Sequence, residues 1–397
     1  MRKFFPTHLL KRFFSACLLF LGVLLGPGPG LGGLSPNETL AKELKNSEPT
    51  ADRTSIADGG FQEMAQRKGK GRKGRKADQD FGSGTFEFRI TPNLYFVDAH
   101  SQMDNNVDEE RVISLMDHAG IYRTNLSHHL FRTFSSLLDF GKQYPERINP
   151  AVRTKGRDTP YPSNVPLQMK QKGFGAMAEV MLFHGSGGGE YKEVRVNFDD
   201  SLVRQAFEAA RSKGWPFIIH IEFASLSGDA RQQYMEMLEK FVIKYRDYPF
   251  VMIHMAQLEA EPVRRLLAAH SNLHFMTSHS SPPYQKGSKP FINMFNDMSL
   301  KREWKQLIAD YPDRFVFAMD NVFSQNWVPS GYLKKMTLWW RALGELPDKL
   351  AHAVAHGNAE RLWKLAPKPD GVEVFQPWNS KEKLGLVTGY SAGTKNR

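Results

Sequence analysis

The chain has 397 residues, a formal net charge of +11 and a single cysteine, Cys17. This length fits one large α/β domain with tails, because α/β barrels commonly use ~250 residues as a single unit. One cysteine excludes an intrachain disulfide and a multi-thiolate metal site, and its position in an N-terminal apolar segment argues against a cysteine nucleophile.

The first 41 residues have the layout of a secretory signal. Basic residues at positions 2, 3, 11 and 12 precede the apolar run 13–25, which is short compared with the ~20 residues that a membrane span needs. Thr39-Leu40-Ala41 offers small residues for cleavage. We therefore predict an exported, periplasmic protein, with an uncleaved N-terminal membrane anchor as the alternative.

Most of the positive charge lies in one short segment. Residues 67–76 carry seven basic and no acidic side chains, which leaves +3 for residues 77–397. This glycine-broken run has nothing apolar to bury, so we predict a disordered basic linker over residues 42–83. It would touch an anionic surface, and no specific nucleic-acid partner is predicted. The remaining chain divides into a domain at 84–370 and a C-terminal tail at 371–397.

From residue 84 onward, apolar runs alternate with amphipathic stretches, a pattern typical of βαβ units around a parallel sheet. It predicts an α/β fold, specifically a TIM-like (β/α)8 barrel. The eight expected strands are 94–100, 121–127, 147–153, 175–183, 216–222, 250–255, 273–278 and 315–320. The clearest helices are 200–213, 229–246, 260–270 and 299–310.

Three local features refine this prediction. Asp200 is placed to cap the helix at 200–213, Gly214 to end it, and Leu202, Ala206, Ala209 and Ala210 to form its apolar face. A later helix, 333–346, is expected to pack Trp339 and Trp340 against the barrel instead of exposing them as an interface. The loops 185–189 and 280–288 would lie on the catalytic rim as lids.

Four predicted strands end in a possible metal ligand. Side chains alternate along a strand, so Asp98, His100 and Gln102 are expected to share a face, and so are His220 and Glu222. His254 and Asp320 end two further strands. Since reactive groups of a barrel gather at the carboxyl ends of its strands, these residues would converge. Imidazoles with a carboxylate suit zinc or a similar divalent ion.

Each residue also has a simpler interpretation when taken alone. His254 would be a hydrogen-bonded rim residue, Asp320 would cap the following turn, and Glu222 would be solvated. The joint occurrence at strand ends favours a common site.

At these residues the chain resembles the amidohydrolase superfamily, in particular the amidohydrolase-related branch of metal-dependent hydrolases and decarboxylases. The resemblance covers roughly residues 92–366. The first-strand motif D-x-H-x-H stands here as residues 98–102, with Gln102 in place of the second histidine. The histidines of strands five and six match His220 and His254, the aspartate of strand eight matches Asp320, and a closing G-N-A-x-R-L motif stands at 357–362.

The resemblance implies a divalent metal, zinc being the first choice, and a set of ligand positions. These are His100, Gln102, Glu179 on strand four, His220, His254 and Asp320. For a single ion, His100, His220 and Asp320 would hold it. Asp320 would take a proton from metal-activated water, and His254 would act as an acid/base or oxyanion contact. Glu222 would orient a ligand, and an ion pair is the alternative role for Glu179.

Three functions remain open at this point. The first is an exported hydrolase of an amide, ester or lactone, the second a non-oxidative decarboxylase of an aromatic or unsaturated acid. The third is a barrel that has lost strong metal binding through Gln102 and now only binds ligands. The expected partner is a small molecule. Basic groups near the strand ends favour one with a carboxylate or phosphate; they are His128, His129, Arg153, Lys155, His184 and His279.

Limited proteolysis tests the domain boundaries. Residues 42–80 have too little apolar content to offset the entropy of ordering, so protease should trim them first and leave a stable core beginning near residue 84. Mass spectrometry of the fragments locates the cuts. First cleavage inside 92–366, with the linker protected, would contradict the boundary.

Overall fold

The computed structural model describes residues 91–129, 131–155, 164–186, 193–282 and 291–374. The predicted signal segment and basic linker lie outside these residues, as do most of the tail and most of both predicted lid loops. Within the described residues, no helix is both long and apolar enough to cross a membrane.

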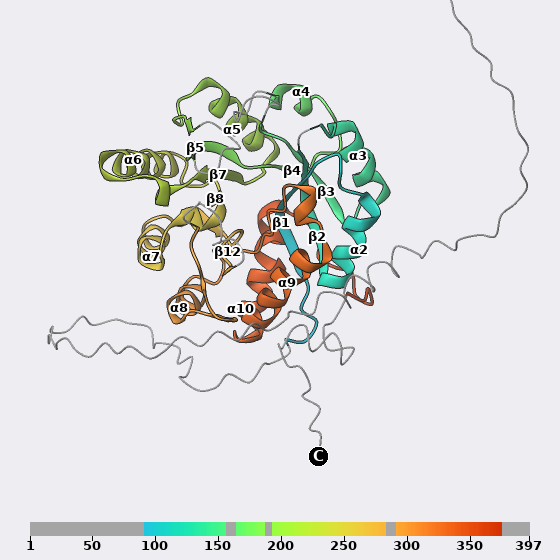
Figure 1. Ribbon diagram of the computed structural model, residues 1–397. Helices are drawn as coiled ribbons and strands as arrows, with labels where there is room; N and C mark the ends of the chain where they lie inside the picture. Colours follow the sequence, from blue (N-terminus) through green and yellow to red (C-terminus); the bar gives the residue numbers. More distant parts are fainter. Residues whose placement is uncertain (1–90, 130, 156–163, 187–192, 283–290, 375–397) are drawn as a thin grey trace, which may run out of the picture. The chain divides into compact units, whose positions relative to one another are not determined.

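The described chain has an α/β architecture in which a curled parallel sheet is surrounded by helices (Figure 1). One sheet has the strand order β1-β2-β3-β4 and another the order β12-β9-β8-β7-β5-β6. The parallel strands are β1 Phe96–Met103, β2 Ile121–His128, β3 Ile148–Val152, β4 Ala176–Met177, β5 Val180–His184, β7 Phe217–Ile221, β8 Phe250–Met252, β9 Leu273–Met276 and β12 Phe315–Val316. Short antiparallel pairings add β6 Val194–Arg195, beside β5, and the pair β10 Phe295–Asn296 and β11 Ser299–Leu300.

The helices lie around the outer side of these strands (Figure 1). They are α2 Glu109–Ala119, α3 Phe134–Gln143, α4 Val165–Met169, α5 Ser201–Lys213, α6 Gly228–Lys244, α7 Ala260–Ala269, α8 Arg302–Asp310, α9 Pro329–Gly344, α10 Asp348–His352 and α11 Asn358–Trp363. Short turns of other helix types are η1 Phe223–Ser225, η2 Ile253–Gln257, η4 Ser324–Asn326 and η5 Ala353–Gly357.

Backbone hydrogen bonds join the two sheets where the last strand meets the first. Ala99 N donates to Phe317 O at 3.1 Å, and Asp320 N donates to His100 O at 2.8 Å. Gln102 N donates to the carbonyl of Asn321 at 2.6 Å. At the other junction β4 and β5 follow each other along the chain, separated only by residues 178 and 179. The segment after β12 is therefore fixed beside the end of β1.

The predicted helices are present, but the buried face of one and the first residue of another differ from the prediction. Asp200 caps α5, accepting from Leu202 N at 2.8 Å, and Gly214 ends it in the left-handed region with φ of 65°. The buried face of α5 is displaced from the predicted one and consists of Val203, Ala206, Phe207 and Ala210. The helix expected from residue 299 begins at Arg302, because residues 299 and 300 pair in β11.

Two predicted strands are shorter than expected. The run at 250–255 leaves the strand after Met252, because His254 and its neighbours have positive φ. The run at 315–320 is regular only over β12, although its backbone remains bonded to β1. Trp339 and Trp340 are 3% exposed, so the prediction that their helix packs inward is confirmed.

Asp98 does not share a face with the neighbouring His100 as predicted, because the register of β1 shifts between Asp98 and Ser101. Its carboxylate instead accepts from Ser101 Oγ at 2.6 Å, Thr124 Oγ1 at 3.2 Å and Met319 N at 2.8 Å. Burial raises its pKa to about 6, against the opposing effect of these hydrogen bonds. Asp98 thus ties β1 to β2 and to the segment after β12.

Replacing Asp98 should destabilise the fold. Asp98→Ala leaves the buried Met319 N–H without its acceptor, at a cost of about 2 kcal/mol or more in the free energy of unfolding. Asp139→Ala, at an exposed ion pair with Lys142, is the matched control and should change stability by less than ~0.5 kcal/mol. Urea unfolding followed by tryptophan fluorescence gives both values. Equal free energies of unfolding for the two variants would show that the Asp98 hydrogen bonds do not stabilise the fold.

Candidate functional site

Chemically active side chains gather at the carboxyl ends of the parallel strands. His100 and Gln102 come from β1, Glu179 lies between β4 and β5, and His220 is on β7. The remaining members follow the ends of strands: Lys155 after β3, Glu222 after β7, His254 after β8, His279 after β9 and Asp320 after β12. All are buried except His279, which is partly buried. This end of a parallel barrel is where such folds carry their active sites.

Asp320 contacts most of the imidazoles in this set of residues. Its Oδ1 lies 3.4 Å from Nε2 of His100 and accepts a long 3.4 Å hydrogen bond from the Gln102 amide. Its Oδ2 lies 3.4 Å from Nε2 of His254 and 3.5 Å from Nε2 of His279. One carboxylate is therefore approached by three imidazoles from different strands.

The backbone of this group is strained. His254, His279 and Asp320 have φ of 55°, 55° and 46°, in the left-handed region that residues with a side chain rarely adopt. Such conformations cost on the order of 1–3 kcal/mol each and cluster at functional sites. The rings of His254 and His279 stack at 4.3 Å, and His254 Nδ1 lies 2.9 Å from Ser278 Oγ, which fixes the orientation of that imidazole.

Glu179 forms a second, adjacent charge cluster. Its carboxylate contacts Lys155 Nζ at 2.6 Å and His100 Nε2 at 2.5 Å, and Gln102 donates to it at 3.4 Å. Burial alone would raise the pKa of Glu179, but Lys155 and His100 outweigh it and hold the pKa well below the usual value. Burial would likewise lower the pKa of His100, but Glu179 and Asp320 raise it. Of the two alternatives for Glu179, the ion pair is present.

His220 lies beside a third group, which contains Glu222 and His184. Its Nε2 lies 3.6 Å from Glu222 Oε1, and Nε2 of His184 lies 3.8 Å from the same oxygen. Its ring centroid is 5.1 Å from that of His254, so the two groups are neighbours. Glu222 is 1% exposed, which contradicts the interpretation of Glu222 as a solvated rim residue.

Basic groups line the adjoining strand ends. Arg153 follows β3 and is buried, as are His128 and His129 at the end of β2. Burial lowers the pKa of both imidazoles to about 3, with Arg153 adding to the effect in each case. At neutral pH the permanent positive charge here belongs to Arg153 and Lys155.

The donors at Asp320 fit a divalent metal ion. Imidazole nitrogen and carboxylate oxygen are the ligands that zinc prefers, and ligating histidines must be neutral. Burial, with the nearby His279, lowers the pKa of His254 well below the usual value, which keeps it neutral. Within the described residues, both ring nitrogens of His220 are buried and make no hydrogen bond, whereas Nε2 of His100 lies 2.5 Å from Glu179 Oε2. Of the six predicted ligands, His100 and Gln102 contact both carboxylates, Asp320 and Glu179, and His254 lies beside Asp320. His220 lies 3.6 Å from Glu222 instead.

The closing motif at 357–362 positions the last strand. The Asn358 amide donates to Pro312 O and Phe315 O, both at 2.9 Å. Arg361 donates to Asp313 O at 2.6 Å. These bonds fix the chain where it enters β12, and thereby the segment that ends in Asp320.

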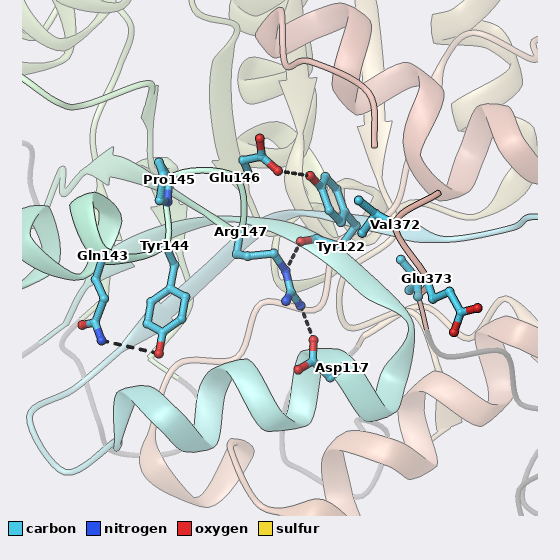
Figure 2. A pocket seen from close by; sticks show the side chains of 10 residues that line it. Asp117, Tyr122, Gln143, Tyr144, Pro145, Glu146, Arg147, Val372 and Glu373 are labelled. Carbon is cyan, nitrogen blue, oxygen red and sulfur yellow. Dashed lines mark hydrogen bonds and ion pairs between the residues drawn. The ribbon is translucent and has the colours of Figure 1, made fainter. Parts of the chain in front are cut away.

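A cavity of about 330 Å³ lies at the opposite ends of the strands, beside Tyr122 at the start of β2 and Arg147 just before β3 (Figure 2). Its polar side chains pair with one another. Tyr122 OH donates to Glu146 at 2.8 Å, and Arg147 contacts Asp117 at 2.6 Å. Its lining contains no histidine, so the candidate site remains the group at the carboxyl ends.

Residues 168–365 match a family model described as amidohydrolase. This part of the chain belongs to the amidohydrolase family. The match includes Glu179 and Asp320, whereas His100 and Gln102 lie before it. None of the curated proteins matches the chain.

Solved structures with a similar chain arrangement include three enzymes. The first is 2,6-dihydroxybenzoate decarboxylase from Rhizobium, with 14% identity over 68% of this chain and 99% of that chain and a TM-score of 0.42. The second is 5-carboxyvanillate decarboxylase from Novosphingobium aromaticivorans with bound manganese, with 14% identity over 70% of this chain and 100% of that chain and a TM-score of 0.43. The third is dihydroorotase from Campylobacter jejuni, with 12% identity over 72% of this chain and 88% of that chain and a TM-score of 0.44. Likeness at this level shows a similar chain arrangement alone.

From the sequence, His279 and Lys155 were expected only as possible substrate contacts. His279 proves to be a partner of Asp320, and Lys155 the counter-ion of Glu179. The available signal was position, since each follows a strand end. The partner of His279 depends on the left-handed turn at that residue, and the partner of Lys155 depends on the path of the chain after β3.

Removing the Lys155 charge should lower the free energy of unfolding, because Glu179 then lies buried without its cation. Lys155→Met leaves the carboxylate with less positive charge, and breaking a buried pair from one side costs roughly 3 kcal/mol in the free energy of unfolding. Lys155→Met combined with Glu179→Gln should recover most of this loss. Lys142→Met, at the exposed pair with Asp139, is the control. Denaturation in the presence of a chelator measures each variant, and no recovery in the double variant would contradict the pairing.

Proposed function

We propose that this chain is a metal-dependent hydrolase of an amide, ester or lactone. The observation that carries the proposal is Asp320, a buried carboxylate approached within 3.5 Å by Nε2 of His100, His254 and His279. These four residues would hold a divalent ion, with zinc as the first candidate. When bound, the ion would polarise the substrate carbonyl and lower the pKa of water.

The protein groups would divide the remaining tasks. Asp320, with two oxygens facing different imidazoles, would accept the proton of the attacking water. Asp320 would pass the same proton on to the leaving group, and His254, neutral and oriented by Ser278, would keep its Nε2 beside Asp320. The Lys155–Glu179 pair and Gln102 would hold His100 in place.

A second function, decarboxylation of an aromatic or unsaturated acid, is favoured by one observation. Arg153, near His128 and His129, and Lys155, in contact with Glu179, place positive charge at the strand ends. A substrate carboxylate would be attracted to that charge. The same cations would equally bind a carboxylate-bearing amide or lactone, so the reaction must be decided by its products.

We also propose export. The support is the basic and apolar pattern of residues 1–41. The partner would be a small molecule, and the basic linker would contact an anionic surface.

Metal content and turnover test the proposed reaction together. Purified full-length chain, stripped by chelator and reloaded with zinc or manganese, should bind metal and convert a member of a panel of amides, lactones and aromatic acids. Asp320→Asn should lower kcat/KM by roughly 10²–10⁴-fold, as loss of a general acid–base group does, and should weaken metal binding. Gln102→His should strengthen it, because imidazole is the better zinc ligand.

The controls separate the alternatives. Asp139→Asn should leave metal content and turnover unchanged, because Asp139 is exposed and pairs with Lys142 on helix α3. Release of CO₂ identifies a decarboxylase, and a new carboxylic acid identifies a hydrolase. Metal-free, normally folded protein with no turnover on any substrate would overturn the enzyme proposal and favour the binding barrel.

A further inference from the structure

Two histidines face each other where β1 begins, at the opposite end of the strands from Asp320. His352 is the last residue of α10, and His356 lies in η5, a π-type turn that continues the same helix. Nδ1 of His352 lies 3.0 Å from Nε2 of His356. Tyr95, just before β1, stacks on the His356 ring at 3.8 Å. Both imidazoles are partly exposed, and π-type turns occur frequently at functional sites.

The outer nitrogen of each ring contacts a group that accepts hydrogen bonds. Nε2 of His352 lies 3.1 Å from the carbonyl oxygen of Pro92. Nδ1 of His356 lies 3.0 Å from Oε2 of Glu360, whose other oxygen accepts from Tyr95 OH at 2.7 Å. Burial would raise the pKa of Glu360, but the hydrogen bonds from His356 and Tyr95 outweigh it and lower the pKa. Carbonyl oxygens and ionised carboxylates only accept, so both outer ring nitrogens must donate.

These two hydrogen bonds fix the ring protons of the pair. A neutral imidazole carries one ring proton, and in each ring that proton is on the outer nitrogen. The inner nitrogens, His352 Nδ1 and His356 Nε2, therefore present lone pairs to each other at 3.0 Å. Facing lone pairs repel each other. A cation between the rings would replace this repulsion by two favourable contacts.

The separation of the inner nitrogens suits a metal ion. Nitrogens bound to zinc at ~2.1 Å lie about 3.0–3.4 Å apart, depending on the angle between the bonds. Imidazole has an ordinary pKa of ~6.5, so a proton would fill the same place in acid. The contact of His356 with Glu360 is also typical of metal ligands, because a ligating histidine usually donates its other ring N–H to a carboxylate.

We propose that Nδ1 of His352 and Nε2 of His356 bind one divalent transition-metal ion. Imidazole pairs suit zinc, copper(II) and nickel(II), and the partial exposure of the rings lets water complete the coordination. Glu360 is a positioning residue, because it holds the proton on Nδ1 of His356 and so directs the lone pair of Nε2 at the ion. The site does not depend on the proposed function, since none of its residues belongs to the Asp320 group.

Equilibrium dialysis of the full-length chain against buffered free zinc, at slightly alkaline pH, tests the site. His352→Gln and His356→Gln should each bind one equivalent less than the unmodified protein, because each removes a ligand. His118→Gln, at a partly buried helical histidine whose Nδ1 contacts Ser114 O, is the control and should bind as much as the unmodified protein. Circular dichroism with chelator present checks folding.

Glu360→Gln tests the assignment of the ring protons without removing a ligand. Tyr95 OH would donate to the new amide oxygen, and the amide NH₂ would then donate to Nδ1 of His356. The ring proton of His356 would move to Nε2 and bond to His352 Nδ1, so the pair would no longer need a cation. The free zinc concentration at half-occupancy should rise roughly 10–100-fold, as loss of an outer contact to a ligand does. This variant carries the test if His352→Gln and His356→Gln do not fold.

The contradicting outcomes are distinct. Equal zinc binding by the unmodified protein and both histidine variants would overturn the site, since the cation between the rings would then be a proton. An unchanged half-occupancy in Glu360→Gln would overturn it as well. Asp320→Asn combined with His352→Gln should bind one equivalent less than Asp320→Asn alone. Full zinc binding by Asp320→Asn would instead overturn the ion of the proposed function and leave this site standing.

Discussion

The site depends on the backbone bonds between β1 and the segment after β12. Ala99 N, Asp320 N and Gln102 N each take part in a hydrogen bond across this junction. Because residues more than 200 positions apart in sequence are joined in this way, His100 and Asp320 come within 3.4 Å of each other. Asp98 reinforces the junction through Met319 N. The catalytic geometry is thus a consequence of how the last strand meets the first.

Buried charge explains the composition of the site. Three carboxylates, Glu179, Asp320 and Glu222, lie at the strand ends with little access to water. Each must meet positive or polar groups, because an isolated buried carboxylate would protonate instead. Glu179 is satisfied by Lys155. Glu222 accepts a hydrogen bond from Gly185 N. Asp320 faces three imidazoles at 3.4 to 3.5 Å, an arrangement that a divalent ion between the carboxylate and the imidazoles would stabilise.

Much of this could be predicted from sequence, because buried parallel strands are continuous apolar runs and the residues that end them meet at one edge. The same reasoning failed where a local turn redirects a side chain. The register shift in β1 turns Asp98 away from His100, and left-handed backbone brings His279 to Asp320. The orientation of Glu222 beside His220 depends on a contact between Glu222 and Gly185. None of these follows from spacing, since each depends on contacts between separate strands.

The most direct test of the account is X-ray diffraction at the zinc absorption edge from crystals of the full chain grown with zinc. The account predicts an anomalous peak within about 2.3 Å of an Asp320 carboxylate oxygen and of at least one neighbouring Nε2, the distances of zinc coordination. An ordered Asp320 contacted only by protein donors, with no anomalous peak at this end of the strands, would contradict it.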